Sequence, residues 1–355
     1  MSQLLSPRGR RVRAATCRRR RRRRGISLLE ILVAIFILSI GLLGVAALIP
    51  VGNSEVIKSS IAHRSAETGL RAFREMKLRG YLNPQNWLAG GQAVVDPETG
   101  VMKPEFAGQT VVIDPLTSQT NGQAIPGADV KTLTLRSALA TETSKTSGPM
   151  SAPVAERVFV AQDNLEFIRP REQTKVPMQF REGETGPRRR TMPIYSWMAM
   201  LSPMQVMPGG TLAPEFKLDT YLMSVIVFYR DTPGSTPRRA LLMNTEPLGG
   251  NEFRFRIPEG SDEDAKKFLR PRRWVLLTDG KRQFRWYRIG TVEGSVAEER
   301  GDRVVSLAGP DWGSQAGGQP QAIVFESVVA VIEKVVQLEG QSMWSPGASP
   351  TTGRK

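Results

Sequence analysis

An uninterrupted apolar segment near the N-terminus constrains this chain more than any other feature of its sequence. Residues 31–51 read ILVAIFILSIGLLGVAALIPV, and none of them carries a charge. At a helical rise of 1.5 Å per residue this segment would extend about 31 Å, close to the thickness of the hydrocarbon core of a bilayer. The sequence therefore predicts a helix that spans a membrane.

The segment that precedes the apolar run is strongly basic. It holds eleven arginines before Gly25, seven of them in the run from Arg18 to Arg24, and no acidic residue. The formal net charge of the chain is +15, and 15 minus these 11 leaves only +4 for the remainder. Positive flanks stay on the cytoplasmic side of a membrane, so we expect the rest of the chain outside the cytoplasm. Because the arginines abut a span and lack interleaved aromatic residues, no nucleic acid is expected as a partner.

A short junction, Gly25-Ile26-Ser27-Leu28-Leu29-Glu30, joins the basic and apolar segments. Gly25 has no Cβ, so its backbone can extend into the active site of a protease. Glu30 requires an explanation, because a carboxylate at the edge of a lipid-embedded helix costs free energy unless it is paired. One alternative is that Ser27 and Glu30 form a helix capping box, which is compatible with a second role for the carboxylate.

Residues 18–52 resemble the type III signal of type IV prepilins and of type II secretion pseudopilins, with a basic leader ending in glycine and a glutamate five residues later. Within that family, LLEILVA followed by ILSIGLLG is similar to minor pilins of the pilus modification V class. The resemblance implies cleavage between Gly25 and Ile26 by prepilin peptidase, followed by N-methylation of Ile26. It also implies that Glu30 pairs with the new amine of a neighbouring subunit during filament assembly.

The resemblance implies a structural subunit of a type IV pilus or a type II secretion system, and not an enzyme. Its expected partners are prepilin peptidase, other pilin or pseudopilin subunits and lipids of the bacterial inner membrane, from which it passes into a pilus or pseudopilus. One alternative is a single-pass, membrane-anchored β-rich enzyme or ligand-binding protein. Another is an ordinary secretory signal cleaved near Ala47, although Glu30 inside the apolar region argues against it.

The sequence divides the chain into a leader (1–25), a transmembrane and assembly helix (26–52) and an amphipathic continuation of that helix (53–80). From Asn53 to Arg79 there is no proline, and Gly80 is a natural helix stop. One apolar stripe recurs at spacings of three and four and is expected to pack against the head: Ala62, Ala66, Leu70, Phe73 and Met76.

Residues 81–340 are expected to form a β-rich, mainly antiparallel head, which makes the fold α+β with the long helix packed on that head. A loop is expected at about 115–156, an exposed turn at 181–192 and a flexible tail at 341–355. The expected strands are 110–113, 157–161, 221–229, 240–243, 252–257, 274–277, 284–289, 303–307 and 322–338.

Residues with catalytic or ligating chemistry are sparse. Cys17 and His63 are the only cysteine and histidine, so no cofactor or metal site is expected. The acidic run 261–264 is expected to be a solvated turn, and Trp197, Met198 and Met200 are expected in the core. Arg270, Arg272 and Arg273 form a local basic face to which the sequence assigns no role.

Overall fold

The structure is a computed structural model, which describes residues 27–98, 100–118, 124–125, 128, 130–136, 148–160, 165–167, 189–191, 194–204, 220–230, 239–279, 283–294, 302–312 and 320–339. The leader 1–25, Ile26 and the tail 341–355 lie outside the described residues. The chain divides into two compact units, Met1–Lys58 and Ser59–Lys355.

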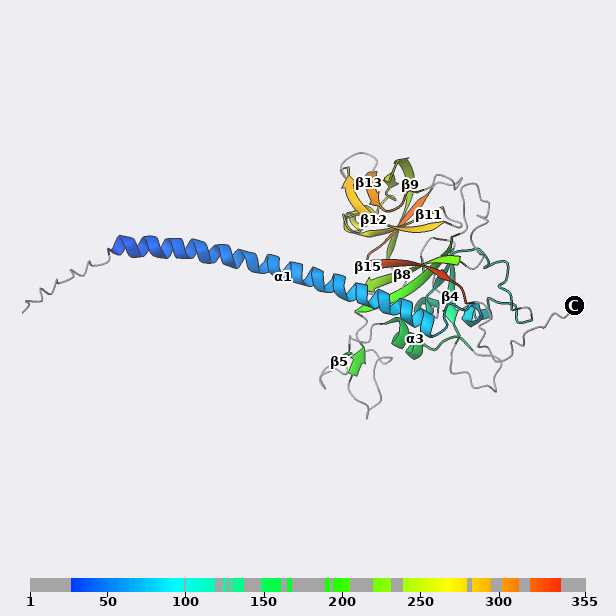
Figure 1. Cartoon of the computed structure of the whole chain (residues 1–355). Coiled ribbons are helices and arrows are strands. Elements are labelled where there is room, and N and C mark those ends of the chain that lie inside the picture. The colour runs from blue at the N-terminus through cyan, green and yellow to red at the C-terminus, as the bar shows by residue number, and fades with distance from the viewer. Residues whose placement is uncertain are drawn as a thin grey trace, which may run out of the picture. The chain divides into compact units, whose positions relative to one another are not determined.

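Helix α1 (Leu28–Leu78) confirms the long N-terminal helix, close to the expected limits of 26 and 79 (Figure 1). In the first unit every described side chain up to Lys58 is exposed, although nearly all of them between Ile31 and Val51 are apolar. This helix is long and apolar enough to cross a membrane, by length and composition. Pro50 lies within the helix, where it removes one backbone donor without ending the helical segment.

The buried face of the second half of α1 is not the predicted one. Ala62, Ala66 and Leu70 are exposed, Phe73 is partly buried, and only Met76 of the expected stripe is fully buried. The helix instead buries a neighbouring face of mostly small residues: Ser65, Thr68, Gly69, Ala72 and Met76. The buried hydroxyls of Ser65 and Thr68 bond to the carbonyls of Ala62 (3.0 Å) and Arg64 (2.8 Å), so burying them leaves no unpaired donor.

Small residues occupy the buried face because the helix lies close to the sheet. A Cβ atom placed on Gly69 would lie 2.3 Å from Ile332 Cδ1 and 3.5 Å from Val227 Cγ2. No side chain fits at that distance without displacing its neighbours, so a larger residue at position 69 would displace either the Ile332 side chain or the helix.

The head contains a seven-stranded sheet in the order β15-β8-β7-β3-β4-β1-β2, in which only the β3–β4 pair is parallel. Its central strands β7 (Tyr195–Pro203) and β8 (Thr220–Tyr229) are buried along almost their whole length. The other strands are β1 (Trp87–Ala89), β2 (Gln92–Ala93), β3 (Val111–Ile113), β4 (Lys131–Leu135) and β15 (Val328–Gln337).

The chain leaves this sheet after β8, forms a closed six-stranded barrel and returns as β15. The barrel is therefore an insertion between two strands that pair with each other. Its strands are β9 (Ala240–Gly249), β10 (Glu252–Arg256), β11 (Trp274–Thr278), β12 (Phe284–Glu293), β13 (Arg303–Ala308) and β14 (Gln321–Phe325). Helix α4 (Asp262–Phe268) connects β10 to β11.

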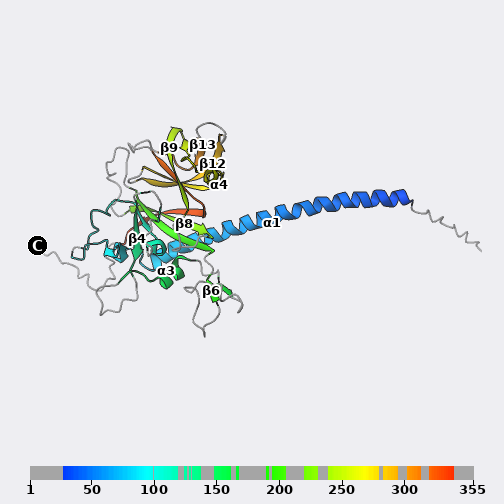
Figure 2. The same cartoon turned by 180° about the vertical axis from the view of Figure 1, so that it is seen from behind.

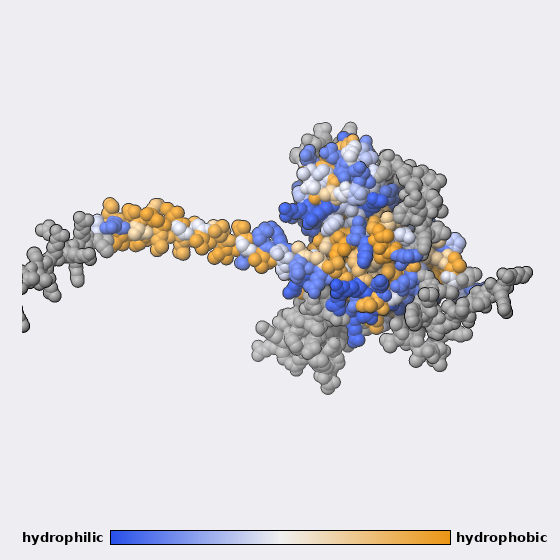
Figure 3. Space-filling model, in the orientation of Figure 1, coloured by the Kyte–Doolittle hydropathy of each residue, from blue (hydrophilic) through white to orange (hydrophobic). Residues whose placement is uncertain are grey.

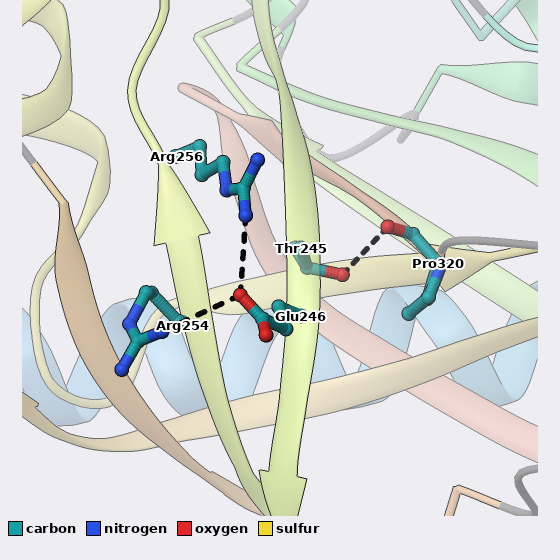
Figure 4. Close-up of polar contacts among 5 residues, drawn as sticks. All are labelled: Thr245, Glu246, Arg254, Arg256 and Pro320. Atoms are coloured by element: carbon teal, nitrogen blue, oxygen red, sulfur yellow. Dashed lines mark hydrogen bonds and ion pairs between the residues drawn. The ribbon is translucent and has the colours of Figure 1, made fainter.

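Polar contacts hold the first barrel strands in place (Figure 4). The Glu246 carboxylate of β9 accepts hydrogen bonds from Arg254 (3.4 Å) and Arg256 (3.2 Å) of β10. The buried Thr245 hydroxyl donates to the Pro320 carbonyl (2.7 Å), which fixes the approach to β14. The exposed Glu246 ion pairs contribute little individually, whereas the buried hydroxyl would be costly to leave unpaired.

The seven-stranded sheet is covered on both faces, by α1 on one and by the barrel on the other (Figures 1 and 2). Alternate residues of β7 and β8 serve the two sides: Ala199 and Val225 join the core that contains Ala72 and Met76. Met200 and Ile226 join a second core with barrel side chains such as Trp286 and Phe325. This arrangement explains why these strands read as continuous apolar runs and do not alternate. A third core, including Phe253, Phe255 and Tyr287, fills the barrel.

Two expectations for the middle of the head are wrong. Residues 157–161 were expected as a strand, but α3 (Ala152–Phe159) is a helix with a proline in its first turn, and it buries Ala155, Val158 and Phe159 at helical spacing. The expected loop 115–156 contains a short helix α2 (Pro115–Ser118), the buried strand β4 and the start of α3. Three short elements complete the fold: η1 (Pro84–Asn86), β5 (Leu165–Phe167) and β6 (Arg189–Thr191).

The expected strand 322–338 is two strands in two different sheets. β14 closes the barrel against β9, while β15 forms the edge of the seven-stranded sheet, and Glu326 and Ser327 separate them. The sequence pattern did not indicate this break, because both strands are largely apolar and together read as one continuous apolar run.

Candidate functional site

The candidate site is the N-terminal turn of α1. The Ser27 carbonyl accepts the backbone amides of Glu30 (3.0 Å) and Ile31 (3.3 Å), which forms the first turn of the helix. Glu30 is exposed in that turn, where a carboxylate interacts favourably with the helix dipole. Gly25 and Ile26, the two residues of the expected cleavage site, lie outside the described residues.

The proposed capping box is not formed within the described residues. Neither the Ser27 hydroxyl nor the Glu30 carboxylate makes a side-chain hydrogen bond or an ion pair in the described chain, where the first such bond along α1 belongs to Ser39. Between Arg24 and Glu55, Glu30 is the only charged residue of the sequence. The carboxylate is thus accessible to a cation from outside the described chain.

The side chains around Glu30 are apolar and exposed. Leu28, Leu29 and Ile31 expose 75%, 70% and 48% of their surface, although such residues are normally buried. No soluble environment suits a helix that is apolar all round, whereas lipid or a bundle of similar helices does. A carboxylate in such surroundings is stabilised by a paired cation, because the ionised form is costly to remove from water.

Comparison with known families supports this interpretation of the segment. Residues 20–46 match the family model described as the prokaryotic N-terminal methylation motif. The chain carries a prepilin methylation motif. This motif and the long apolar helix that follows it are consistent with a type IV pilin-like precursor, a substrate of prepilin peptidase. Searches among curated proteins and among solved structures found no match.

The structure also places the other residues that the sequence singled out. His63 is exposed on α1, and the described residues contain no group of His, Cys, Asp and Glu side chains that could hold a metal ion. Trp197 stacks on Phe159 (4.2 Å between centroids) and donates to the Val158 carbonyl (3.0 Å), as a core residue does. The expectation of a turn at 261–264 is wrong, because helix α4 begins at Asp262, and its Asp264 pairs with Arg239 (3.0 Å).

The basic face at 270–273 is held by backbone carbonyls. Arg270 Nε donates to the Lys266 carbonyl (3.1 Å), and Arg273 donates to the Glu326 carbonyl (2.6 Å). Arg288 donates to the Arg272 carbonyl (3.3 Å) and lies over the Trp274 ring (5.8 Å to the centroid). These contacts close the turn between α4 and β11 and satisfy carbonyls at the end of α4.

Sequence reasoning missed two features of the head. One is the close approach of α1 to the sheet at Gly69, for which the signal was the spacing of the small residues Ser65, Gly69 and Ala72. The other is the barrel inserted between β8 and β15. No local pattern indicates a barrel, because its closure depends on pairing between strands far apart in the sequence.

Proposed function

We propose that the chain is a structural minor pilin or pseudopilin of a type IV pilus or a type II secretion system, and that it has no catalytic role. The observation that carries this proposal is the match of residues 20–46 to the methylation motif, directly at the start of an exposed apolar helix. In this account the leader arginines hold the N-terminus in the cytoplasm, and the span anchors the subunit in the inner membrane with its head outside.

The proposed assembly step is electrostatic. Cleavage between Gly25 and Ile26 creates an α-amine, which methylation leaves able to carry a positive charge. Glu30 of one subunit would then pair with the Ile26 amine of its neighbour, away from water. A buried ion pair is strongly destabilised when one partner is removed, because the remaining charge is left uncompensated. This dependence would make correct register a condition of entry into the filament.

Replacing Glu30 tests this role against that of a helix cap. Glu30→Ala makes the span more apolar, so membrane insertion and cleavage are expected to proceed. Glu30→Gln keeps the size of the side chain and removes only the charge, so it is the matched variant. Both variants should accumulate in the membrane and be depleted at least tenfold from sheared filaments, since loss of a partner from a buried pair costs about 3–5 kcal/mol.

The control is Glu55→Gln, which removes the next carboxylate along α1, one that is exposed and pairs with Lys58 at 2.7 Å. An exposed i,i+3 pair contributes only about 0.3–0.5 kcal/mol, so this variant should enter filaments normally. Normal incorporation of Glu30→Ala and Glu30→Gln would contradict the assembly role.

A further inference from the structure

The head has one end at which helix α1 enters it. Gly69 of α1 lies beside Ile332 of β15, and farther along both segments the Glu339 amide donates to the Leu82 carbonyl (3.1 Å). Helix and strand therefore advance in the same sense, so the residues of α1 that precede Gly69 lie where β15 begins. We call this region, around the first residues of β15, the entry end.

Two tyrosines and two arginines meet at the entry end. The Tyr229 amide, at the end of β8, donates to the Ser327 carbonyl just before β15 (2.8 Å). Tyr195 of β7 is the partner of Tyr229, and their ring centroids are 5.3 Å apart. Arg230 lies over the Tyr229 ring (5.2 Å to the centroid). Burial raises the pKa of Tyr195 and the positive charges of Arg64 and Arg230 oppose that rise, so Arg64 of α1 lies close to the same tyrosines.

The charges of these two arginines are not used within the described part of the head. Arg64 and Arg230 are exposed, and neither forms an ion pair with another residue that the structure describes. Arg230 also has a φ of 54°, a left-handed backbone conformation that is uncommon for residues other than glycine. Its amide donates to the Ile194 carbonyl (2.7 Å), which holds it in that conformation. A residue kept in an unfavourable conformation, with its charge unpaired, is typical of a functional position.

The inserted barrel adds basic and aromatic side chains to the same end. Phe325, the last residue of β14, meets Phe228 of β8 edge-on, with 6.2 Å between the ring centroids. The register between β11 and β14 places Trp274 next to Phe325, and Arg288 lies over the Trp274 ring (5.8 Å to the centroid). Three more arginines adjoin this pair: Arg239, Arg272 and Arg273. Among the six arginines of the entry end, only Arg239 pairs with carboxylates of the described chain.

This composition matches the surface that proteins place against lipid headgroups. Tryptophan and tyrosine are enriched at membrane–water interfaces, because each has an apolar ring and a polar tip. Each basic residue near an anionic lipid surface strengthens attachment about fivefold. Figure 3 shows hydrophobic side chains along the first half of α1 and strongly hydrophilic ones on the head beside the point where the helix enters it. Because α1 continues from the apolar run into the entry end, this end is the part of the head nearest to the span along the chain.

The length of α1 between the span and the head permits contact. Arg64 follows Val51, the last residue of the apolar run, by 13 residues, which is about 20 Å along a helix. A tilt of about 40°, within the range of membrane-spanning helices, lowers this height to about 15 Å, and Pro50 is a position at which helices bend. The headgroups extend about 5–7 Å beyond the hydrocarbon core, and electrostatic attraction acts over about 8 Å more at physiological salt. Anionic lipid therefore attracts the entry end before the two touch.

We propose that the entry end of the head is a docking surface for the anionic phospholipid headgroups of the membrane in which α1 is anchored. The unpaired arginines bind the lipid phosphates, while Tyr229 and Trp274 lie at the level of the headgroups. The inference rests on one part of the proposed function, which is that α1 spans a membrane with the head outside the cytoplasm. A docked head must leave the lipid surface before its subunit enters a filament.

Fluorescence quenching in lipid nanodiscs measures whether the head lies on the membrane. The full-length chain, with Cys17→Ser so that no other cysteine remains, carries a dye at Ser327→Cys. This substitution keeps the Ser327 carbonyl that accepts the Tyr229 amide. The discs hold phosphatidylcholine alone or with phosphatidylglycerol, and a spin label attached to some headgroups quenches the dye only at short range. The control label is Gln337→Cys, which is exposed at the other end of β15, about 30 Å away.

The dye at position 327 should be quenched at least fivefold more in anionic discs than in zwitterionic discs, and high salt should remove the difference. The dye at position 337 should be quenched little in either. Equal quenching at position 327 in the two kinds of disc would overturn the proposal. Quenching that appears only when another motif-bearing subunit shares the disc would also overturn it, because the surface would then serve a protein partner.

A pair of double variants tests whether these particular arginines are responsible. Arg64→Gln/Arg230→Gln removes two exposed charges that form no ion pair within the described chain. Arg74→Gln/Lys77→Gln is the matched control, because both residues are likewise exposed and unpaired there but lie farther along α1 from the entry end. The first variant should lower the ratio of docked to undocked heads at least tenfold, and the control less than twofold. Equal effects would refute the assignment, and if the first variant does not fold, the comparison of lipids with the wild-type arginines decides.

The two proposals fail separately. Docking on anionic lipid by a chain that its host does not cleave after Gly25 would keep the lipid surface and remove the pilin assignment. Cleavage after Gly25 in a chain whose head ignores anionic lipid would do the reverse.

Discussion

Gly69 offers a direct test of how α1 is attached to the head. A Cβ at this position would lie 2.3 Å from Ile332 Cδ1 and 3.2 Å from Ile332 Cγ1, so Gly69→Val must push the helix or the isoleucine out of place. Overpacking of this kind costs about 1–3 kcal/mol, and valine's better helix propensity recovers only about 0.4 kcal/mol of it. We therefore expect a net loss of about 2 kcal/mol in the free energy of unfolding.

The measurement is denaturant unfolding of the full-length chain in detergent, followed by the fluorescence of its six tryptophans. Ala66→Val on the exposed face of α1 is the control, and it should cost only about 0.6 kcal/mol, the loss in helix propensity from alanine to valine. Ile332→Val removes the Cδ1 atom that clashes, so the double variant Gly69→Val/Ile332→Val should be about 1 kcal/mol more stable than the two single changes predict. Strict additivity, or a Gly69→Val protein as stable as wild type, would refute close packing at this point.

Two further substitutions test the cores. Met76→Ala should lower the free energy of unfolding by about 2–5 kcal/mol because Met76 is fully buried, whereas Leu70→Ala should have little effect on the isolated subunit because Leu70 is 55% exposed. Burial raises the pKa of Tyr287 to about 12, and its hydroxyl has no hydrogen-bond partner among the residues that the structure describes. The unfolded chain loses this proton at a lower pH than the folded chain does, so the free energy of unfolding should fall as the pH rises from 10 towards 12. Tyr287→Phe should leave the free energy of unfolding at pH 7 almost unchanged and should reduce the loss at alkaline pH. Unfolding measured over a range of pH tests both expectations.

The N-terminal segment was predictable from the sequence because its properties depend only on residues close together in the chain. The apolar run, the basic flank and the single carboxylate Glu30 each constrain the chain without reference to distant residues. The α1 limits followed for the same reason. The buried face of α1 was not predictable in this way. The expected stripe beginning at Ala62 was chosen by hydrophobicity, whereas the close approach of the helix to the sheet requires small residues. Ser65, Gly69 and Ala72 are poor in apolar surface but allow close approach.

Most strand segments of the head were predictable, but their assignment to sheets was not. β14 and β15 share one apolar run, yet β14 pairs with β9 and β15 pairs with β8. Partner choice depends on contacts between residues far apart in the sequence, which a local pattern does not record. The segment around Val158 was mistaken for a strand because four of its residues are apolar or β-branched, whereas the proline at the start of α3 and the spacing of Ala155, Val158 and Phe159 fit a helix.

The central claim is that the chain is a prepilin, and the N-terminus of the mature protein tests it most directly. Protein isolated from the membranes and sheared filaments of its native host is digested, and its N-terminal peptide is identified by mass spectrometry. The account predicts a peptide that begins at Ile26 and carries a methyl group on its α-amine, and a precursor that stays uncleaved when Gly25 is replaced by a bulky residue. A mature chain that retains the arginine leader, or one that begins after Ala47, would contradict it.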